Sequence, residues 1–418
     1  MDGMSTREPS PTGGITWLEE IPVFGEPVEN AVEQIRMVAE DADRVALMAD
    51  HHLGYSMPIG GVAAYRDLVS PSGVGFDIAC GNKAVRLDLS AREIGPRIAE
   101  IMDEIFHSIS FGMGRKNPEP VEHPLFHDDP AWAIPAVADL LELARKQLGT
   151  VGGGNHYVDL FRDEQDRVWV GVHFGSRGFG HKIATHFLEA GAPRRGADSG
   201  MNAPPVLIPA DTNLGEEYLA AMNLAGRYAY AGRDWVCERV AELLGAPILE
   251  EVHNHHNFTW RETHFGEEYW VVRKGATPAF PGQLGFVGGS MAESSVILRG
   301  VDSEESRIGM YSTVHGAGRV MSRRAAAGKK HYRRGRGKKK RRGSRDEPGG
   351  LVSLEMMREW VQRAGVELRG GGVDESPHCY RRLEDVLAAH AGTIEILHRL
   401  VPMGVAMAPA DEWDPYKD

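Results

Sequence analysis

The spacing of apolar residues predicts a chain in which helices and strands are interleaved. Residues 27–42 place Val28, Val32, Ile35 and Val38 on one face of a helix. Short apolar runs between polar or glycine-rich turns instead indicate buried strands. Such runs lie at 44–50, 82–89, 167–174, 248–254, 268–274 and 295–300.

Helical periodicity recurs along the rest of the chain, and one long stretch contains two candidate breaks at Gly226 and Gly232. Helices are predicted at 91–109, 133–149, 181–190, 214–245, 354–365 and 383–400. No period of 20–50 residues recurs, which argues against a repeat architecture. Strands and helices alternate without a regular βαβ rhythm. The pattern predicts one mixed α/β (α+β) domain over residues 27–418, after a weakly structured lead-in at 1–26.

Composition places the 418-residue chain among soluble globular proteins, with 42% apolar and 25% charged residues. No apolar run reaches membrane-spanning length, and the three cysteines are too widely spaced to indicate a disulfide framework. We therefore expect a reduced, cytoplasmic protein that does not enter membranes. Glycine is enriched, at 50 residues, and clusters beside Asp, His, Cys, Asn and Arg. Such turns let the backbone approach a ligand or metal closely.

The net charge of −12 conceals a basic run at 323–345, which holds thirteen Lys or Arg residues and no acid. One interpretation is a solvated, partly disordered insert. The other is an arm that contacts the phosphates of RNA. The two are compatible, because a disordered basic arm can bind RNA.

Four loops carry residues that could hold a metal ion. In GVGFDIACGN (73–82), Asp77 and Cys80 lie three residues apart in a glycine-bracketed turn. The other loops are GTVGGGNHYVDL (149–160), GVHFGSRGFGH (171–181) and VHNHHNFTW (252–260). A single histidine or cysteine is more often a core residue than a ligand. Together, however, imidazole, thiolate and carboxylate suit a divalent metal such as Zn or Mn, and a pair of ions could be bridged.

Two further stretches are candidates for phosphate chemistry. The segment GGSMAESS (288–295) offers hydroxyl groups and backbone amides that could grip phosphate, although an ordinary polar turn is the alternative. In STVHGAGRVMSR (312–323), His315 is either a core histidine beside a tight turn or a reactive imidazole. The latter segment lacks the Gly-Lys-Ser/Thr ending of a P-loop.

These motifs resemble, in order, those of the RtcB family of RNA-splicing ligases. The resemblance rests on MADHHLGYSMPIGGV, GVGFDIACG, GTVGGGNHYVDL, VHFGSRGFGH, HHNF followed by VVRKGA, GGSM, HGAGRVMSR and DESPHCY. It covers residues 27 to 407 and implies mixed sheets around a central metal and nucleotide cleft. It also implies joining of RNA with a 2′,3′-cyclic phosphate or 3′-phosphate end to RNA with a 5′-hydroxyl end, using two Mn²⁺ ions and GTP.

The resemblance also implies a role for each matching residue. His315 would be the nucleophile that takes GMP from GTP. The metal ligands would be Asp77, Cys80, His156, His173 and His256. The nucleotide would be lined by Asn155, Asp159, Ser290, Ser295, Gly316, Gly318, Tyr380 and Met407. Arg177 and Arg323 would contact phosphates or RNA, and Asp50 and His52 would face the site.

The chain departs from the family pattern at four positions. Met407 stands where the family has a lysine close to the guanine, and Asp159 replaces a more usual Glu. Ala49 and Ala292 replace Pro and Gly. None of these changes removes a proposed metal ligand or His315. The first two bear on recognition of the base, since Met offers no cationic donor.

Three functions remain open from the sequence. The first is an RNA ligase, expected to act as a monomer, with an archease-like activator protein as a candidate partner. The second is a metal-dependent phosphodiesterase or phosphatase that opens cyclic phosphates without ligation. The third is a non-catalytic RNA-binding protein that uses the arm at 323–345.

Overall fold

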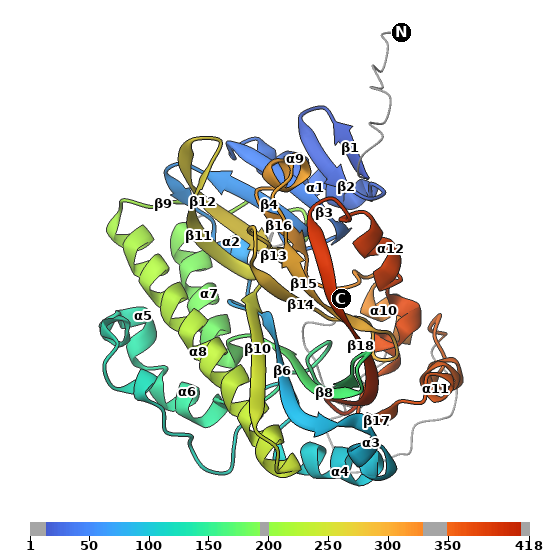
Figure 1. The fold of residues 1–418 in the computed structure, drawn as a ribbon. Helices are drawn as coiled ribbons and strands as arrows, with labels where there is room; N and C mark the ends of the chain where they lie inside the picture. Colours follow the sequence, from blue (N-terminus) through green and yellow to red (C-terminus); the bar gives the residue numbers. More distant parts are fainter. Residues whose placement is uncertain (1–13, 193–199, 329–348, 411–418) are drawn as a thin grey trace.

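The computed structural model describes residues 14–192, 200–328 and 349–410, and it confirms the mixed α/β class. Two large sheets share one domain (Figure 1). The six-stranded sheet has the order β1-β2-β3-β4-β12-β11. Its strands are β1 (Ile15–Leu18), β2 (Ile21–Phe24), β3 (Arg44–His52), β4 (Ile59–Tyr65), β11 (Asn257–His264) and β12 (Glu267–Lys274). Among the described residues, no helix has the length and apolar character that a membrane span requires.

The eight-stranded sheet has the order β10-β6-β8-β7-β18-β15-β14, with β17 paired in parallel to β18. Its strands are β6 (Gly81–Ser90), β7 (Tyr157–Arg162), β8 (Arg167–Phe174), β10 (Ile248–His255), β14 (Leu284–Val287), β15 (Ser295–Gly300), β17 (Glu367–Arg369) and β18 (Ile394–Met407). Two-stranded sheets join β5 (Leu68–Val69) to β9 (Ile208–Pro209) and β13 (Ala276–Pro278) to β16 (Ser312–Val314). The chain passes directly from β10 in one large sheet to β11 in the other, so the turn at His256 connects the two sheets.

Helices pack on the outer faces, and the longest, α8 (Asn213–Leu244), runs beside β6, β8 and β10 (Figure 1). The other helices are α1 (Glu29–Ala39), α2 (Pro71–Val74), α3 (Ala91–Ile94), α4 (Ile98–Ser108), α5 (Pro135–Ala138), α6 (Leu141–Gln147), α7 (Arg177–Gly191), α9 (Glu304–Ile308), α10 (Arg323–Ala327), α11 (Leu354–Arg363) and α12 (Leu383–Ala388). Short 3-10 helices include η4 (Val373–Glu375) and η5 (Pro377–Cys379). Thr212 caps α8 by accepting a hydrogen bond from the backbone N–H of Gly215.

The predicted lead-in at 1–26 differs from the structure where the structure describes it. Residues 15–24 form the hairpin of β1 and β2, because Ile21, Val23 and Phe24 are buried in the core and Val23 pairs with Leu47 of β3. Residues 1–13 lie outside the described residues. The basic run at 323–345 begins as helix α10, while its part from 329 onward lies outside the described residues, so the RNA-arm interpretation stays a prediction.

The helix prediction at 383–400 was wrong in its extent. The stretch 383–400 is helical only to Ala388, and from Ile394 the chain forms β18, which fills the space between β7 and β15. Pairing on both sides overrides the local helical pattern. In contrast, α8 continues through both Gly226 and Gly232, because both glycines lie buried against neighbouring side chains.

Candidate metal and nucleotide site

Strand pairing brings the predicted metal ligands to one end of the eight-stranded sheet. Cys80 directly precedes β6, His156 directly precedes β7, and His173 lies near the end of β8. The pairing of β6, β8 and β7 puts Asn82 and Tyr157 opposite His173 on its two sides. Residues from distant parts of the chain therefore converge because their strands are neighbours.

The ligand atoms of three of these residues form a compact buried cluster. Cys80 Sγ lies 3.7 Å from Nε2 of His156 and 3.7 Å from Nε2 of His173, and the three ligand atoms lie within 4.8 Å of one another. Asp77 Oδ2 is 3.1 Å from His156 Nε2. The ring of His256 stacks on that of His173 at a centroid distance of 5.1 Å. The structure thus clusters the ligand atoms of Cys80, His156 and His173, with Asp77 beside His156 and the His256 ring beside His173.

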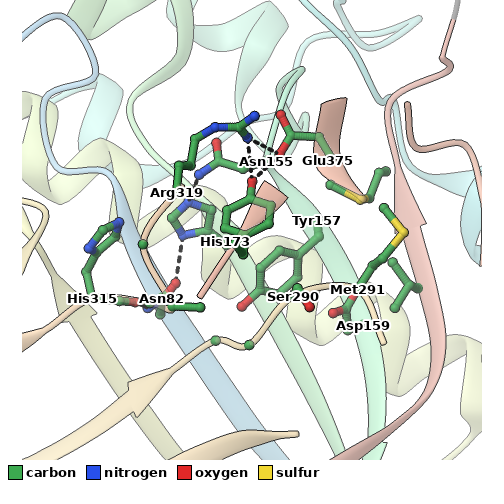
Figure 2. A pocket seen from close by; sticks show the side chains of 18 of the residues that line it. Asn82, Asn155, Tyr157, Asp159, His173, Ser290, Met291, His315, Arg319 and Glu375 are labelled. Carbon is green, nitrogen blue, oxygen red and sulfur yellow. Dashed lines mark hydrogen bonds and ion pairs between the residues drawn. The ribbon is translucent and has the colours of Figure 1, made fainter. Parts of the chain in front are cut away.

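A second layer of contacts fixes the orientation of His173. Its Nδ1–H donates to Asn82 Oδ1 at 2.7 Å (Figure 2). Nε2 of the same ring lies 3.7 Å from Cys80 Sγ. The Asn82 amide in turn donates to the carbonyls of Phe286 and His315, at 2.9 and 3.2 Å. A metal-bound histidine usually donates its other N–H in this way. Asn82 was not among the predicted site residues, although it ends the GVGFDIACGN motif.

The protonation states of the side chains in the cluster also suit the binding of a divalent cation. Burial lowers the pKa of His173 and of His256 well below the usual range, so both rings are neutral and keep a lone pair. Burial raises the pKa of Asp77, but the hydrogen bond and charge of His156 outweigh it and hold that pKa at about 2. Burial raises the pKa of the Cys80 thiol, which a bound metal would deprotonate. This donor set fits a borderline metal ion.

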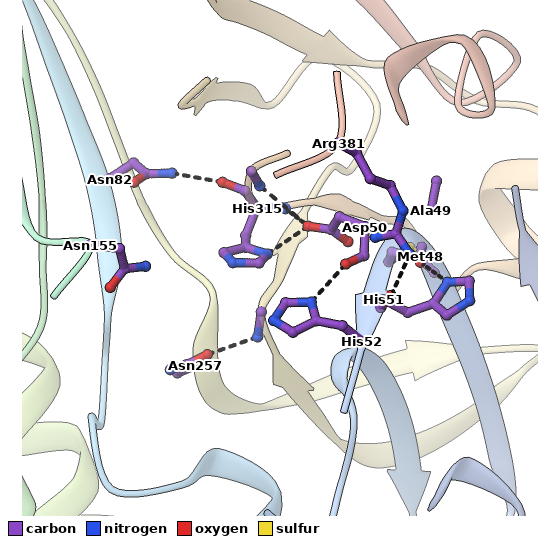
Figure 3. Close-up of polar contacts among 12 residues, drawn as sticks. Met48, Ala49, Asp50, His51, His52, Asn82, Asn155, Asn257, His315 and Arg381 are labelled. Carbon is purple, nitrogen blue, oxygen red and sulfur yellow. Dashed lines mark hydrogen bonds and ion pairs between the residues drawn. The ribbon is translucent and has the colours of Figure 1, made fainter. Parts of the chain in front are cut away.

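His315 lies beside this cluster and is held by Asp50. Its Nδ1 lies 2.6 Å from Asp50 Oδ2, and the backbone N–H groups of His315 and Gly316 donate to the same oxygen at 3.0 and 3.3 Å (Figure 3). Burial raises the pKa of Asp50, but the charge of His315 and its hydrogen bonds lower it overall. Because the carboxylate is ionised, Nδ1 carries the proton and Nε2 is the free nitrogen. The ring of His315 lies 4.8 Å from that of His256.

A pocket of about 700 Å³, counting its open mouth, adjoins the cluster and His315 (Figure 2). It is lined by His52, Asn82, Asn155, Tyr157, Asp159, His173, Gly288, Gly289, Ser290, Met291, His315, Gly316, Ala317, Gly318, Arg319, Glu375, Tyr380, Val405 and Met407. Seven of the eight residues predicted to contact a nucleotide are in this set. Gly318 has φ of +74°, and an added Cβ there would lie 2.4 Å from the Asp50 carbonyl oxygen.

One side of the pocket is apolar and holds an uncompensated carboxyl group. Asp159 and Tyr157 of β7 lie opposite Val405 and Met407 of β18. Oδ1 of Asp159 and the hydroxyl of Tyr157 are buried without a hydrogen-bond partner among the described residues. Burial alone raises the pKa of Asp159 well above the usual range. The two atoms are therefore available to a bound ligand.

Three of the residues predicted to contact nucleotide, phosphate or RNA do not line the pocket. Ser295 Oγ instead accepts a hydrogen bond from the backbone N–H of Gly289 at 3.0 Å, so it shapes the GGSM turn. Arg177 donates to Thr150 Oγ1 and to the carbonyl of Gly112, at 3.3 and 3.1 Å. Arg323 pairs with Glu375 at 3.1 Å. Their predicted contacts with nucleotide, phosphate or RNA remain predictions.

Sequence reasoning missed an ion-pair cluster at the pocket wall. Glu375, which is 3% exposed, accepts from Arg319 at 3.1 Å and from the Tyr380 hydroxyl (Figure 2). Arg319 also donates to the Tyr380 hydroxyl at 2.9 Å. Both motifs were singled out, HGAGR and DESPHCY, but their charged residues were not connected because 56 positions separate Arg319 from Glu375.

Comparison with known proteins gives a consistent match over this whole region. A family model described as tRNA-splicing ligase RtcB matches residues 31–136 and 135–408. The RNA-splicing ligase RtcB of Escherichia coli K12 is 31% identical, over 92% of this chain and 94% of the relative. The tRNA-splicing ligase RtcB of Archaeoglobus fulgidus is 31% identical over 90% and 91%, and that of Thermococcus kodakarensis is 31% identical over 86% of each.

Proposed function

Because the chain belongs to the RtcB family of tRNA-splicing ligases, we propose that it is an RNA ligase that acts through His315. It joins an RNA end bearing a 3′-phosphate or 2′,3′-cyclic phosphate to an end bearing a 5′-hydroxyl. GTP is the energy source, and two Mn²⁺ ions are the metal cofactors. The phosphodiesterase and RNA-binding alternatives lack the support that His315 gives to ligation.

The observation that carries this proposal is the Asp50–His315 pair. Asp50 Oδ2 accepts a hydrogen bond from Nδ1–H of His315, so the lone pair of the neutral ring is on Nε2, in a residue that lines the pocket. A positioned and correctly tautomerised imidazole is a competent nucleophile. A histidine that served only to pack the core would not require a carboxylate beside it. Burying a carboxylate costs folding free energy.

The proposed reaction has three balanced steps after any cyclic phosphate has been hydrolysed to a 3′-phosphate. Nε2 of His315 attacks the α-phosphorus of GTP, the bond to the β-phosphate breaks, and pyrophosphate leaves. The 3′-phosphate of the RNA then displaces the histidine and takes the GMP group. Finally, the 5′-hydroxyl attacks the activated 3′-phosphate, a 3′,5′ phosphodiester forms, and GMP leaves with the hydroxyl proton lost to solvent.

The residues of the cluster would hold the metal ions that this chemistry needs. Asp77, Cys80, His156, His173 and His256 are the side chains that would hold them. The bound ions would neutralise charge on the phosphate oxygens. Asn155, Ser290 and the backbone of Gly316 and Gly318 offer polar groups to the nucleotide within the same pocket.

A labelling experiment tests the proposal. The protein is incubated with α-labelled GTP and Mn²⁺, and with RNA carrying a 3′-phosphate and a 5′-hydroxyl. We expect acid-labile, alkali-stable label on the wild type, none on His315→Ala, and joined RNA only with the wild type. Cyclic-phosphate opening without label or joined product would instead support the phosphodiesterase. Unchanged RNA binding by His315→Ala with no chemistry in the wild type would support the non-catalytic alternative.

A further inference from the structure

Arg233 of α8 is fully buried, and its hydrogen bonds converge on the backbone of the metal cluster. Its Nη1 donates to the carbonyl oxygens of Ala79 and Phe174, at 3.0 and 2.5 Å. Its Nη2 lies 3.0 Å from Nδ1 of His255, and its Nε donates to Nε2 of His253 at 2.7 Å. The side chain is 0% exposed.

Three of these partners are direct chain neighbours of proposed metal ligands. Ala79 precedes Cys80, Phe174 follows His173, and His255 precedes His256. These ligands come from the turn before β6, from the end of β8 and from the turn after β10. A single planar guanidinium therefore connects the three segments, and its fork geometry fixes their spacing in a way that one ammonium group cannot.

The chemistry of the partners argues against an ordinary buried ion pair. Among the described residues, the hydrogen-bond partners of Arg233 are two carbonyls and two imidazoles, with no carboxylate. Each imidazole presents a ring nitrogen to the guanidinium, Nε2 of His253 and Nδ1 of His255. A buried cation with only neutral partners is costly for folding. An arginine at this buried position therefore indicates a role that an apolar side chain could not fill.

The backbone around Arg233 leaves room for this contact. A Cβ at Gly81 would lie 3.1 Å from Nη2 of Arg233 and 2.1 Å from the carbonyl oxygen of Asn254. The glycine therefore allows β6, β10 and the guanidinium to meet directly behind Cys80. His253 and His255 belong to VHNHHNFTW (252–260), one of the four loops predicted to carry candidate metal ligands. In the structure both are acceptors for Arg233 and neither belongs to the metal cluster.

We propose that Arg233 is a positioning residue of the metal centre, which sets the relative placement of Cys80, His173 and His256 through the residues next to them. This inference rests on the proposed function only in taking those three residues as metal ligands. Arg233 touches neither nucleotide nor RNA, and its effect passes through the backbone segments that it joins.

The test measures metal binding in the full-length protein without GTP or RNA. Arg233→Lys keeps the charge and loses the fork. We expect the affinity for Mn²⁺ to fall by about 10–100-fold, the range typical for residues that orient metal ligands. With Co²⁺ as the probe, we expect the thiolate-to-metal absorption band and the ligand-field bands to shift. Unchanged affinity together with an unchanged Co²⁺ spectrum would overturn the proposal.

Arg273→Lys is the matched control. Arg273 is equally buried, at 0%, but it donates to Glu262, Ser312 and the carbonyl of Met310, away from the ligand segments. It should lower thermal stability while leaving Mn²⁺ affinity within about twofold of the wild type, because no ligand segment depends on it. Equal loss of affinity in both variants would show that Arg233 acts only through general stability, and would contradict the proposal.

A second pair of variants keeps the test decisive if Arg233→Lys does not fold. His255→Leu removes the acceptor for Nη2, whereas His255→Asn keeps an oxygen near the position of Nδ1. We expect a changed Co²⁺ spectrum for His255→Leu and recovery of most of the wild-type spectrum for His255→Asn. Identical spectra in both would contradict the proposal. Metal binding without RNA joining in the wild type would refute the ligase function alone.

Discussion

At the scale of single residues, the site depends on which nitrogen of His315 carries the proton. The predicted test is Asp50→Asn, with Asp43→Asn as the control, since Asp43 forms an exposed ion pair with Arg66. An amide at position 50 can donate to Nδ1 and so move the proton to Nε2. We expect the rate of GMP transfer to His315 to fall about 10²–10⁴-fold, as measured by single-turnover labelling. A rate within about threefold of the wild type would show that the tautomer does not limit this step.

Asp159 gives a prediction on stability against pH. Its pKa is raised by burial above the usual 3.8, so the folded protein holds this proton more tightly than the unfolded chain does. The stabilisation is fully present below pH 3.8 and is lost as the pH rises toward the folded pKa. We expect Asp159→Asn to gain stability relative to the wild type as the pH is raised from about 4 to 7, in urea unfolding without nucleotide. A constant difference across this range would contradict the assignment.

At the scale of elements, the two glycines of α8 should respond oppositely to alanine. A Cβ at Gly232 would lie 3.4 Å from Cε2 of Phe174, an ordinary contact, whereas one at Gly226 would lie 2.9 Å from Cε2 of Phe258. We expect Gly232→Ala to stabilise the protein by up to about 1 kcal/mol through helix propensity. Gly226→Ala should destabilise it by about 1–3 kcal/mol, because Phe258 must move. Thermal and urea unfolding measure both, and the same sign for both would contradict this account.

The local pattern of apolar residues predicted most helices and strands, but it failed where pairing with distant strands determines the secondary structure. Strands such as β6 and β8 and helix α1 were predicted nearly to their ends, because one buried face gives a clear period. The strand β18 was not, since its residues become strand only between β7 and β15. The resemblance singled out His315 and the five proposed ligands, and the structure brings these residues close together. Arg233, Asn82 and Glu375 could not be found this way, because their roles arise from contacts across distant segments.

At the scale of the whole molecule, the proposed metal ligands come from segments of both large sheets and from the turn that connects them. His256 lies at the turn where β10 of one sheet passes into β11 of the other, and Cys80 precedes β6. Metal binding should therefore stabilise the domain globally. We expect about 2.7 kcal/mol at a free Mn²⁺ concentration 100 times its dissociation constant. Differential scanning calorimetry with and without a chelator measures this, and Cys80→Ala should abolish the shift. A shift retained in Cys80→Ala would place the ion elsewhere.

The position of β18 has a consequence for how the chain is made. Its partners β7 and β15 lie earlier in the chain, at 157–162 and 295–300, and both flank the gap that residues 394–407 fill. During translation, one edge of β7 stays unpaired until β18 has been made. An unpaired strand edge promotes association with other chains. The pocket wall formed by Val405 and Met407 also arrives last. The pocket is therefore complete only after residues 394–407 have been made, so synthesis itself sets the order in which sheet and pocket become complete.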